Sequence, residues 1–209
     1  TSCEGCDPGK YKSAEEHSDE CVACDPGRFN AAANQASCKS CLLGQFAPEN
    51  GTSICSLCPR GKHGQVVSAD DRGATSMAEG CRDCPEGTFS DVDGLKSKDK
   101  CKECAAGFWS NATGIDRQSL CELCAAGKYS PAPRATSESF CHGCNPGYFS
   151  VVVAASSAST CRGCPSGFAQ ENDGSVYCLP CQPGYVQPGN GSMSCVACKR
   201  NTFASAPKS

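Results

Sequence analysis

The sequence is poor in the large apolar side chains that build a hydrophobic core. Leu, Ile, Val and Phe together make up 27 of its 209 residues, about 13%, whereas chains below roughly 20% tend towards disorder. Ordering a backbone of this length costs on the order of 200–400 kcal/mol, and each buried large apolar side chain offsets only about 1.5–3 kcal/mol of that cost. The composition therefore excludes a large globular core, and cross-links must hold the chain together.

Several other features are missing, and each absence excludes a class of protein. No apolar run approaches the roughly 18 residues of a membrane-spanning helix, so we expect no direct membrane span. The 19 basic and 22 acidic residues are spread along the chain, which leaves no basic face for a nucleic acid. His17, His63 and His142 are isolated, and no catalytic constellation can be built around them. We therefore expect neither an enzyme nor a cofactor or metal site.

Cysteine is the residue that the sequence has in excess. All 22 cysteines fall in eleven Cys-x-x-Cys pairs, and a cysteine content of about 10% is typical of disulfide scaffolds. Disulfides at this density persist in oxidising compartments, so we expect an extracellular or cell-surface protein of the secretory pathway. The pairs begin at Cys3, Cys21, Cys38, Cys55, Cys81, Cys101, Cys121, Cys141, Cys161, Cys178 and Cys195.

The cysteine pairs belong to a longer repeated motif, seen clearly in CELCAAGKYS at residues 121–130. A glycine follows the second cysteine by three residues in ten of the eleven copies, and Asn201 replaces it in the last. An aromatic residue follows in every copy except the fourth, which has His63. Because Gly and Asn tolerate positive φ, the motif predicts a turn after each pair, with each ring covering a disulfide. Such a short period indicates a tandem array.

The predicted fold is small and disulfide-rich: an elongated tandem array of short β-hairpin modules with little or no helix. In the short modules an Asn-Gly or Asp-Gly step is the strongest hairpin signal, which predicts strand, tight turn, strand around residues 50–51, 173–174 and 190–191. Where proline directly follows the second cysteine, we expect a type I turn; these prolines are Pro59, Pro85 and Pro165.

The spacing between cysteine pairs suggests how the chain is divided. Most gaps between consecutive pairs contain 13–16 residues, whereas the gap after Cys58 contains 22. We predict repeats 1–4 over residues 1–64, an inserted loop or hinge over residues 65–80, and repeats 5–11 over residues 81–209.

Three kinds of chemistry are compatible with Cys-x-x-Cys. A redox motif would occur once, at the start of a helix, and eleven copies without helices disfavour it. The spacing also resembles a zinc ribbon, so an array of zinc sites with four cysteine ligands each remains a remote alternative. Structural disulfides are the favoured interpretation.

Two disulfide connectivities are natural, and sequence alone does not assign one. In a ladder, each second cysteine joins the next first cysteine, as in Cys6 with Cys21. In a crossed scheme, first joins first and second joins second between paired motifs, which places the 22-residue gap between modules and is slightly favoured for that reason. The crossed scheme predicts Cys3–Cys21, Cys6–Cys24, Cys38–Cys55, Cys41–Cys58, Cys81–Cys101, Cys84–Cys104, Cys121–Cys141, Cys124–Cys144, Cys161–Cys178 and Cys164–Cys181, with Cys195 and Cys198 joined to partners outside the segment.

Two sets of residues are candidates for surface functions. Asn50, Asn111 and Asn190 begin Asn-x-Ser/Thr sequons between the cysteine motifs, which predicts N-linked glycans on exposed loops. The segment from Val151 to Val153, with Val152 between them, begins a strongly apolar loop, and it is a candidate edge strand for lateral contact.

The motif resembles the ephrin-receptor-like cysteine-rich repeat, whose unit is also Cys-x-x-Cys-x-x-Gly-x-aromatic. Residues 6–11, 84–89 and 144–149 match it best, and the pattern is also similar to tumour-necrosis-factor-receptor modules. The resemblance implies a rod of small disulfide-bonded β modules. It leaves two hypotheses. The favoured one is a structural subunit of a surface coat, fibril or flagellar hair that assembles with itself or related repeat proteins, and the alternative is the stalk or ligand-binding ectodomain of a cell-surface receptor.

Overall fold

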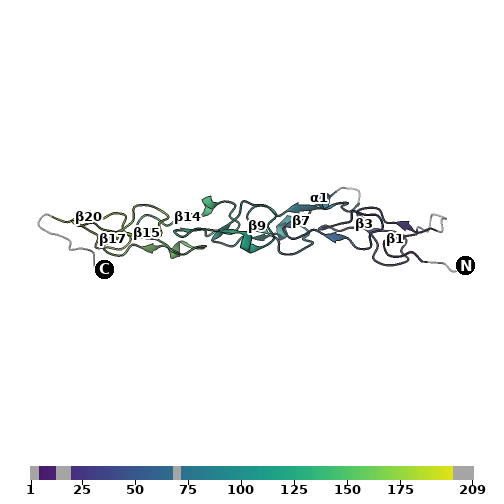
Figure 1. The fold of residues 1–209 in the computed structure, drawn as a ribbon, viewed down its shortest axis with the longest axis horizontal. Helices are drawn as coiled ribbons and strands as arrows, with labels where there is room; N and C mark the ends of the chain where they lie inside the picture. Colours follow the sequence, from purple (N-terminus) through teal and green to yellow (C-terminus); the bar gives the residue numbers. More distant parts are fainter. Residues whose placement is uncertain (1–4, 13–19, 68–71, 200–209) are drawn as a thin grey trace. The chain divides into compact units, whose positions relative to one another are not determined.

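The structure, a computed structural model, describes residues 5–12, 20–67 and 72–199. It contains ten two-stranded antiparallel sheets, each formed by one hairpin, and within each unit described below the hairpins follow one another in chain order (Figure 1). This confirms the predicted array of small disulfide-rich hairpins. The paired strands are β1 (Lys10–Tyr11) with β2 (Val22–Ala23), β3 (Arg28–Phe29) with β4 (Lys39–Ser40), β5 (Gln45–Phe46) with β6 (Ser56–Leu57), β7 (Lys62–Gly64) with β8 (Cys81–Asp83), β9 (Thr88–Phe89) with β10 (Lys102–Glu103), β11 (Phe108–Trp109) with β12 (Glu122–Leu123), β13 (Lys128–Tyr129) with β14 (His142–Gly143), β15 (Tyr148–Phe149) with β16 (Arg162–Gly163), β17 (Phe168–Ala169) with β18 (Leu179–Pro180), and β19 (Tyr185–Val186) with β20 (Val196–Ala197).

Helix is nearly absent from the described residues, as predicted. The only α-helix among them is α1 (Met77–Gly80), a single turn in the inserted segment. Four short 3-10 turns precede the first cysteine of a pair: η1 (Lys98–Lys100), η2 (Gln118–Leu120), η3 (Glu138–Phe140) and η4 (Ala158–Thr160).

The ten turns that follow a cysteine pair in the described residues share one geometry. The residue after the second cysteine accepts a hydrogen bond from the residue three positions later, as in Lys10 N–H to Asp7 O at 3.1 Å. The motif glycine occupies the third position with positive φ, for example +86° at Gly9, which is the requirement of a type II turn. The type I turns expected at Pro59, Pro85 and Pro165 are therefore wrong, because the glycines after them also have positive φ.

The disulfides follow the ladder, and the crossed scheme is wrong. Each hairpin brings the second cysteine of one pair beside the first cysteine of the next, at Cα–Cα distances of 5.6 to 6.0 Å, within the range for a disulfide. One disulfide therefore closes each hairpin, and we call the closed loop a module. The bonds are Cys6–Cys21, Cys24–Cys38, Cys41–Cys55, Cys58–Cys81, Cys84–Cys101, Cys104–Cys121, Cys124–Cys141, Cys144–Cys161, Cys164–Cys178 and Cys181–Cys195.

The crossed scheme is favoured in the sequence by the position of the 22-residue gap, and the structure places this gap differently. The gap was expected to separate two modules, but it lies inside one, as the connection between β7 and β8 that the Cys58–Cys81 disulfide closes. Cys195, expected to bond outside the segment, bonds to Cys181. Cys198, also expected to bond outside the segment, is a free thiol in the described part of the chain. Cys21 bonds to Cys6, and Cys3, its predicted partner, lies outside the described residues.

The chain divides into two compact units. The first comprises residues 1–102 and 112–118, and the second comprises residues 103–111 and 119–209. The predicted insertion at residues 65–80 lies within the first unit.

The core of the modules consists mostly of disulfide sulfurs and small side chains, with a few larger ones such as Phe89 and Ile115. Cys24, Cys58 and Cys124 are completely buried. A second buried position lies six residues after the second cysteine, where serine is frequent, and a third lies eleven residues after it, where alanine is frequent. These side chains are Asn30, Ala47, Ser90, Ser110, Ser130, Ser150 and Gln170 at the second position, and Ile115, Ala135 and Ala155 at the third.

Consecutive modules are joined by backbone hydrogen bonds of constant register. In the second unit, Cys144 N–H donates to Gly127 O at 2.8 Å, and Ala154 N–H donates to Cys124 O at 2.9 Å. A third bond joins the residue after the aromatic position to the loop of the next module, next to a parallel bridge. Because these bonds use backbone atoms only, they recur although the loop sequences differ.

The motif glycine also contacts the module two positions further along. A Cβ on Gly127 would lie 2.0 Å from the carbonyl oxygen of Gly174, and a Cβ on Gly147 would lie 2.3 Å from that of Gly191. Glycine is thus required twice, by its positive φ and by this close approach. The array therefore has contacts beyond the nearest-neighbour contacts typical of repeat proteins.

Candidate functional site

The three sequon asparagines, Asn50, Asn111 and Asn190, are exposed. Asn50 and Asn190 directly precede Gly51 and Gly191, whose N–H groups donate at 2.8 Å to a buried cysteine carbonyl of the preceding module. These glycines do not form the predicted tight hairpin tip. A tight hairpin has a loop of two residues, whereas the connection between β5 and β6, in which Gly51 lies, runs over residues 47–55. The sequons at Asn50 and Asn190 therefore lie on loops that are anchored to the preceding module.

The apolar segment Val151–Val153 is exposed, with exposed fractions of 69%, 43% and 53%. The predicted edge strand is wrong, because these residues lie in no strand. Ser150 and Ala154, on either side, donate their N–H groups to neighbouring modules, and Ala154 has a φ of +52°, which interrupts extended backbone. Val151–Val153 is therefore an exposed loop that is fixed at both ends.

The motif aromatics are mostly half-buried, and one of them shows what such a ring covers. Phe29 packs against Cys41, Cys55 and Ala47, which belong to the next module. The ring therefore covers a disulfide, as predicted, but it lies at the boundary between modules and not within its own. Not every aromatic follows this rule, since Phe140 and Tyr177, which directly precede a cysteine pair, are 44% and 59% exposed.

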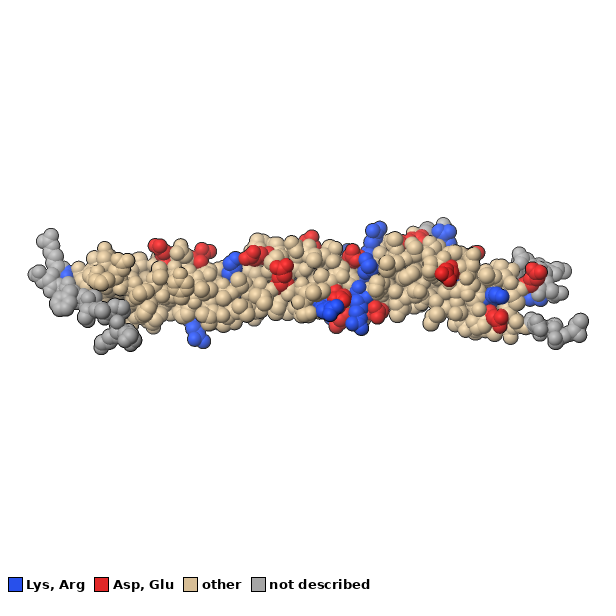
Figure 2. Space-filling view, viewed as in Figure 1, with Lys and Arg blue, Asp and Glu red and all other residues tan. Residues whose placement is uncertain are grey.

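Charge is distributed unevenly along the sequence. Residues 82–102 contain ten charged side chains, whereas residues 139–198 contain three. Figure 2 shows basic and acidic groups next to one another on the visible face, without an extended patch of one sign. Exposed ion pairs such as Lys102–Asp91 at 2.7 Å contribute little stability. The face seen in Figure 2 thus offers no extended single-sign patch for a strongly charged partner.

Four carboxylates have lowered pKa values, those of Glu79, Asp91, Asp116 and Glu138, and two of them show different causes. The hydrogen bond from Lys128 Nζ to Glu138, at 2.7 Å, lowers the pKa of Glu138. The pKa of Glu79 is lowered chiefly by the Thr75 hydroxyl, which donates at 2.6 Å, and then by the Thr75 N–H at 2.8 Å. Both groups are therefore ionised near neutral pH, the wrong state for a general acid.

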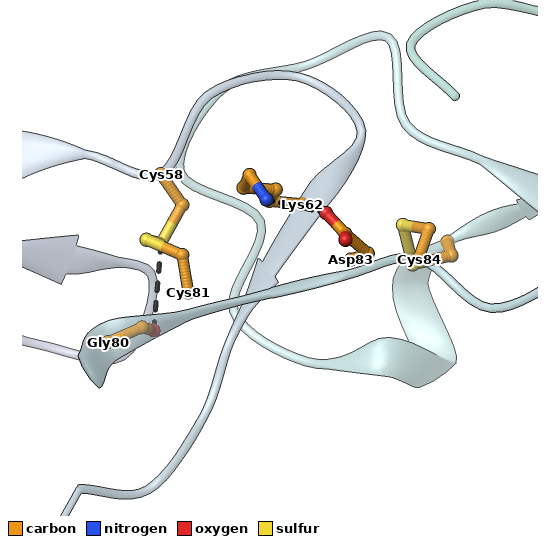
Figure 3. Close-up of polar contacts among 7 residues, drawn as sticks. Cys58, Lys62, Gly80, Cys81, Asp83 and Cys84 are labelled. Carbon is orange, nitrogen blue, oxygen red and sulfur yellow. Dashed lines mark hydrogen bonds and ion pairs between the residues drawn. A yellow bond between two sulfur atoms is a disulfide. The ribbon is translucent and has the colours of Figure 1, made fainter. Parts of the chain in front are cut away.

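The insertion packs against the disulfide of its own module (Figure 3). The carbonyl oxygen of Gly80 lies 3.6 Å from Cys58 Sγ, and a Cβ on Gly80 would lie 2.5 Å from Cβ of Ala74. On the hairpin of the same module, Lys62 of β7 and Asp83 of β8 are cross-strand partners and form an ion pair. The insertion therefore belongs to the packed structure of the first unit.

The alternative of an array of zinc sites with four cysteine ligands each is wrong. Twenty cysteines form ten disulfides, so they lack the thiolates that ligate zinc. Over residues 5–12, 20–67 and 72–199, no group of three or more His, Cys, Asp or Glu side chains could hold a metal ion. Among the same residues, no helix has the length and apolar character needed to cross a membrane.

Comparison with known proteins shows a family similarity in one part of the chain. Residues 27–77 match the family described as tyrosine-protein kinase ephrin type A/B receptor-like. A comparison with curated proteins gave no significant match. The fold and the matched family do not belong to a known enzyme class. The matched residues contain one complete module, closed by Cys41–Cys55, and parts of the modules before and after it. The ladder of disulfides continues the same pattern beyond the match. Residues 27–77 are therefore similar to the ephrin-receptor-like family, and the regular series of disulfides along the described residues is consistent with tandem cysteine-rich repeats of this type.

Proposed function

We propose that the chain is an extracellular structural protein, the subunit of a surface coat, fibril or flagellar hair that assembles through stacked repeats and lateral self-association. The observation that supports this most strongly is the uniformity of the modules. All ten described hairpins have the same turn and the same type of closing disulfide, and the backbone bonds between modules recur in both units. Such uniformity suits a load-bearing or spacing role, in which the array acts as a whole.

The density of disulfides supports a location outside the cell or on its surface, because such bonds persist in oxidising compartments. The exposed sequons agree with passage through a eukaryotic secretory route. For the chain secreted from eukaryotic cells, removal of N-glycans by a peptide-N-glycosidase should lower the mass by up to three glycans. Asn50→Gln, Asn111→Gln and Asn190→Gln should each remove one glycan.

The second candidate is the stalk or ligand-binding ectodomain of a receptor. The match of residues 27–77 to the ephrin-receptor-like family favours it. A full-length gene that encodes neither a membrane anchor nor a signalling domain would contradict this alternative.

Sedimentation velocity and electron microscopy of the purified, oxidised and glycosylated chain test the structural role. We expect oligomers or fibrils whose fraction grows with protein concentration. Monodisperse monomers up to the highest soluble concentration would exclude self-association as the function.

A further inference from the structure

Residues 139–198 of the second unit form a surface with few charges and many exposed apolar side chains. They hold three charged residues but more than half of the 22 large hydrophobic side chains that are exposed in the described residues. Large exposed apolar patches mark interaction sites, because monomeric soluble proteins rarely tolerate them. These exposed side chains are Phe140, Tyr148, Val151, Val152, Val153, Val176, Tyr177, Leu179, Tyr185, Val186, Met193 and Val196.

Two grooves lie at equivalent positions of this segment, each beside the disulfide of its module. The Tyr148 groove, of about 130 Å³, is lined by Tyr129, Asn145, Tyr148, Ala158 and Cys161. The Tyr185 groove, of about 310 Å³, is lined at the corresponding positions by Ala169, Gln182, Tyr185 and Cys195, and also by Glu171, Leu179 and Met193. Both volumes are at or below the lower end of the range for small-molecule pockets, roughly 300–1,000 Å³. The grooves therefore fit single side chains of a macromolecular partner better than a large ligand.

Two protruding side chains recur with the same period as the grooves. Phe140 and Tyr177, which we call the ridge residues, each lie directly before a cysteine pair and are exposed. Each precedes the tyrosine of its groove, Tyr148 or Tyr185, by eight residues. Because the backbone bonds between modules have constant register, the two ridge residues are spaced by the same two-module step as the two grooves.

This match leads to the inference, which rests on the proposed self-association and assigns its surface. We propose that residues 139–198 bind a second copy of this chain, with Phe140 and Tyr177 of one copy inserted into the Tyr185 and Tyr148 grooves of the other. Any partner that fills both grooves must present two apolar side chains at this spacing. A second copy presents two such side chains, Phe140 and Tyr177, because the same repeat sets the spacing of the ridge residues and the spacing of the grooves.

The charge distribution favours a second copy over other partners of an apolar surface. An interfacial helix or segment that binds anionic lipid uses Lys and Arg beside its apolar face, and residues 139–198 contain one basic side chain, Arg162. A strongly charged protein would lose hydration of its charges without finding partners. Two copies of a nearly uncharged surface meet without like-charge repulsion. The disulfides also fix the grooves before contact, which lowers the entropic cost of association.

The first experiment measures self-association of the oxidised full chain by sedimentation equilibrium. Tyr177→Asp places a charge on a ridge residue and leaves the backbone unchanged. Leu179→Asp places a charge in the Tyr185 groove, which Leu179 lines. We expect either change to weaken the association constant at least tenfold. Ile54→Asp is the matched control, because Ile54 precedes Cys55 in the same register and is 77% exposed but lies in the first unit. It should leave the constant within twofold of the parent value.

The second experiment tests insertion of the ridge residue directly. Gln182 lines the Tyr185 groove, and Gln182→Lys places a positive charge there. Phe140→Asp chains and Gln182→Lys chains should each associate weakly alone, whereas an equimolar mixture should associate at least tenfold more tightly than either. Near-native circular dichroism and a full set of disulfides in each variant would show that folding is intact.

The outcomes separate this inference from the proposed function. If the parent chain associates but all of the variants associate equally well, self-association stands and its assignment to residues 139–198 is overturned. If the parent chain is monomeric throughout, both fail. If the ridge variants lose binding to uncharged phosphatidylcholine vesicles but not self-association, the surface binds lipid and the inference is likewise overturned.

Discussion

Replacing the motif glycine tests the contact between a module and the module two positions further along. Gly127→Ala and Gly184→Ala are a matched pair in the second unit, since both glycines follow the second cysteine by three residues and have φ near +85°. The built Cβ of Gly127 lies 2.0 Å from the carbonyl oxygen of Gly174, whereas no described atom lies within 4 Å of that of Gly184.

The magnitude follows from two separate costs. Left-handed backbone costs alanine about 1–2 kcal/mol relative to glycine, and this applies to both variants. The clash at Gly127 involves backbone, which no rotamer change relieves, and overpacking of this kind costs about 1–3 kcal/mol more. Moving Gly127 also strains the hydrogen bond from Cys144 N–H at 2.8 Å. We therefore expect Gly127→Ala to destabilise its module by about 2 kcal/mol more than Gly184→Ala does, which corresponds to about 30-fold in the equilibrium constant for local opening.

Native-state hydrogen exchange with the disulfides intact measures these local openings. For each variant we compare the exchange rate of an amide with its rate in the parent chain. The acceleration at Cys144 and Gly174 in Gly127→Ala should be about 30 times the acceleration at Cys198 in Gly184→Ala. Equal effects in the two variants would refute the contact between next-nearest modules and leave positive φ as the only reason for the glycine.

Three further predictions concern single modules. Ala154→Gly removes a left-handed alanine, so it should slow exchange of its own amide and stabilise the module by about 0.5–1 kcal/mol; faster exchange would contradict this. Because Thr75 lowers the pKa of Glu79, the stability from this carboxylate is present above its unfolded-state pKa and is lost as the pH falls through the lower folded value. The turn around α1 should therefore loosen on acidification, and Glu79→Gln should abolish that pH dependence in hydrogen exchange. The double substitution Cys124→Ser with Cys141→Ser opens a loop with a sequence separation of 17, and hydrogen exchange should show its module destabilised by about 3 kcal/mol. Non-reducing peptide mapping of the parent chain should recover Cys124 linked to Cys141.

A second positive-φ position shows what sequence reasoning could not detect. Ten residues after the second cysteine the backbone is left-handed at Asn34, Arg134 and Ala154 as well as at several glycines. Asn-Gly steps indicated this position in the short modules, but Arg and Ala carry no such signal. The conformation there is imposed by the N–H donated to the cysteine of the preceding module, a tertiary interaction.

The sequence determined the class of structure because its signals are local. The cysteine pairs and the scarcity of large apolar residues required a disulfide scaffold, and the motif glycine required a turn after each pair. The connectivity was decided only by the tertiary structure, because a disulfide depends on which strands pair. Cys124 bonds to Cys141, and not to Cys144 as the crossed scheme required, because β13 folds back on β14 and brings these two Cα atoms to 5.6 Å. The requirement for Gly127 had the same origin, since its neighbour Gly174 lies 47 positions away in the sequence.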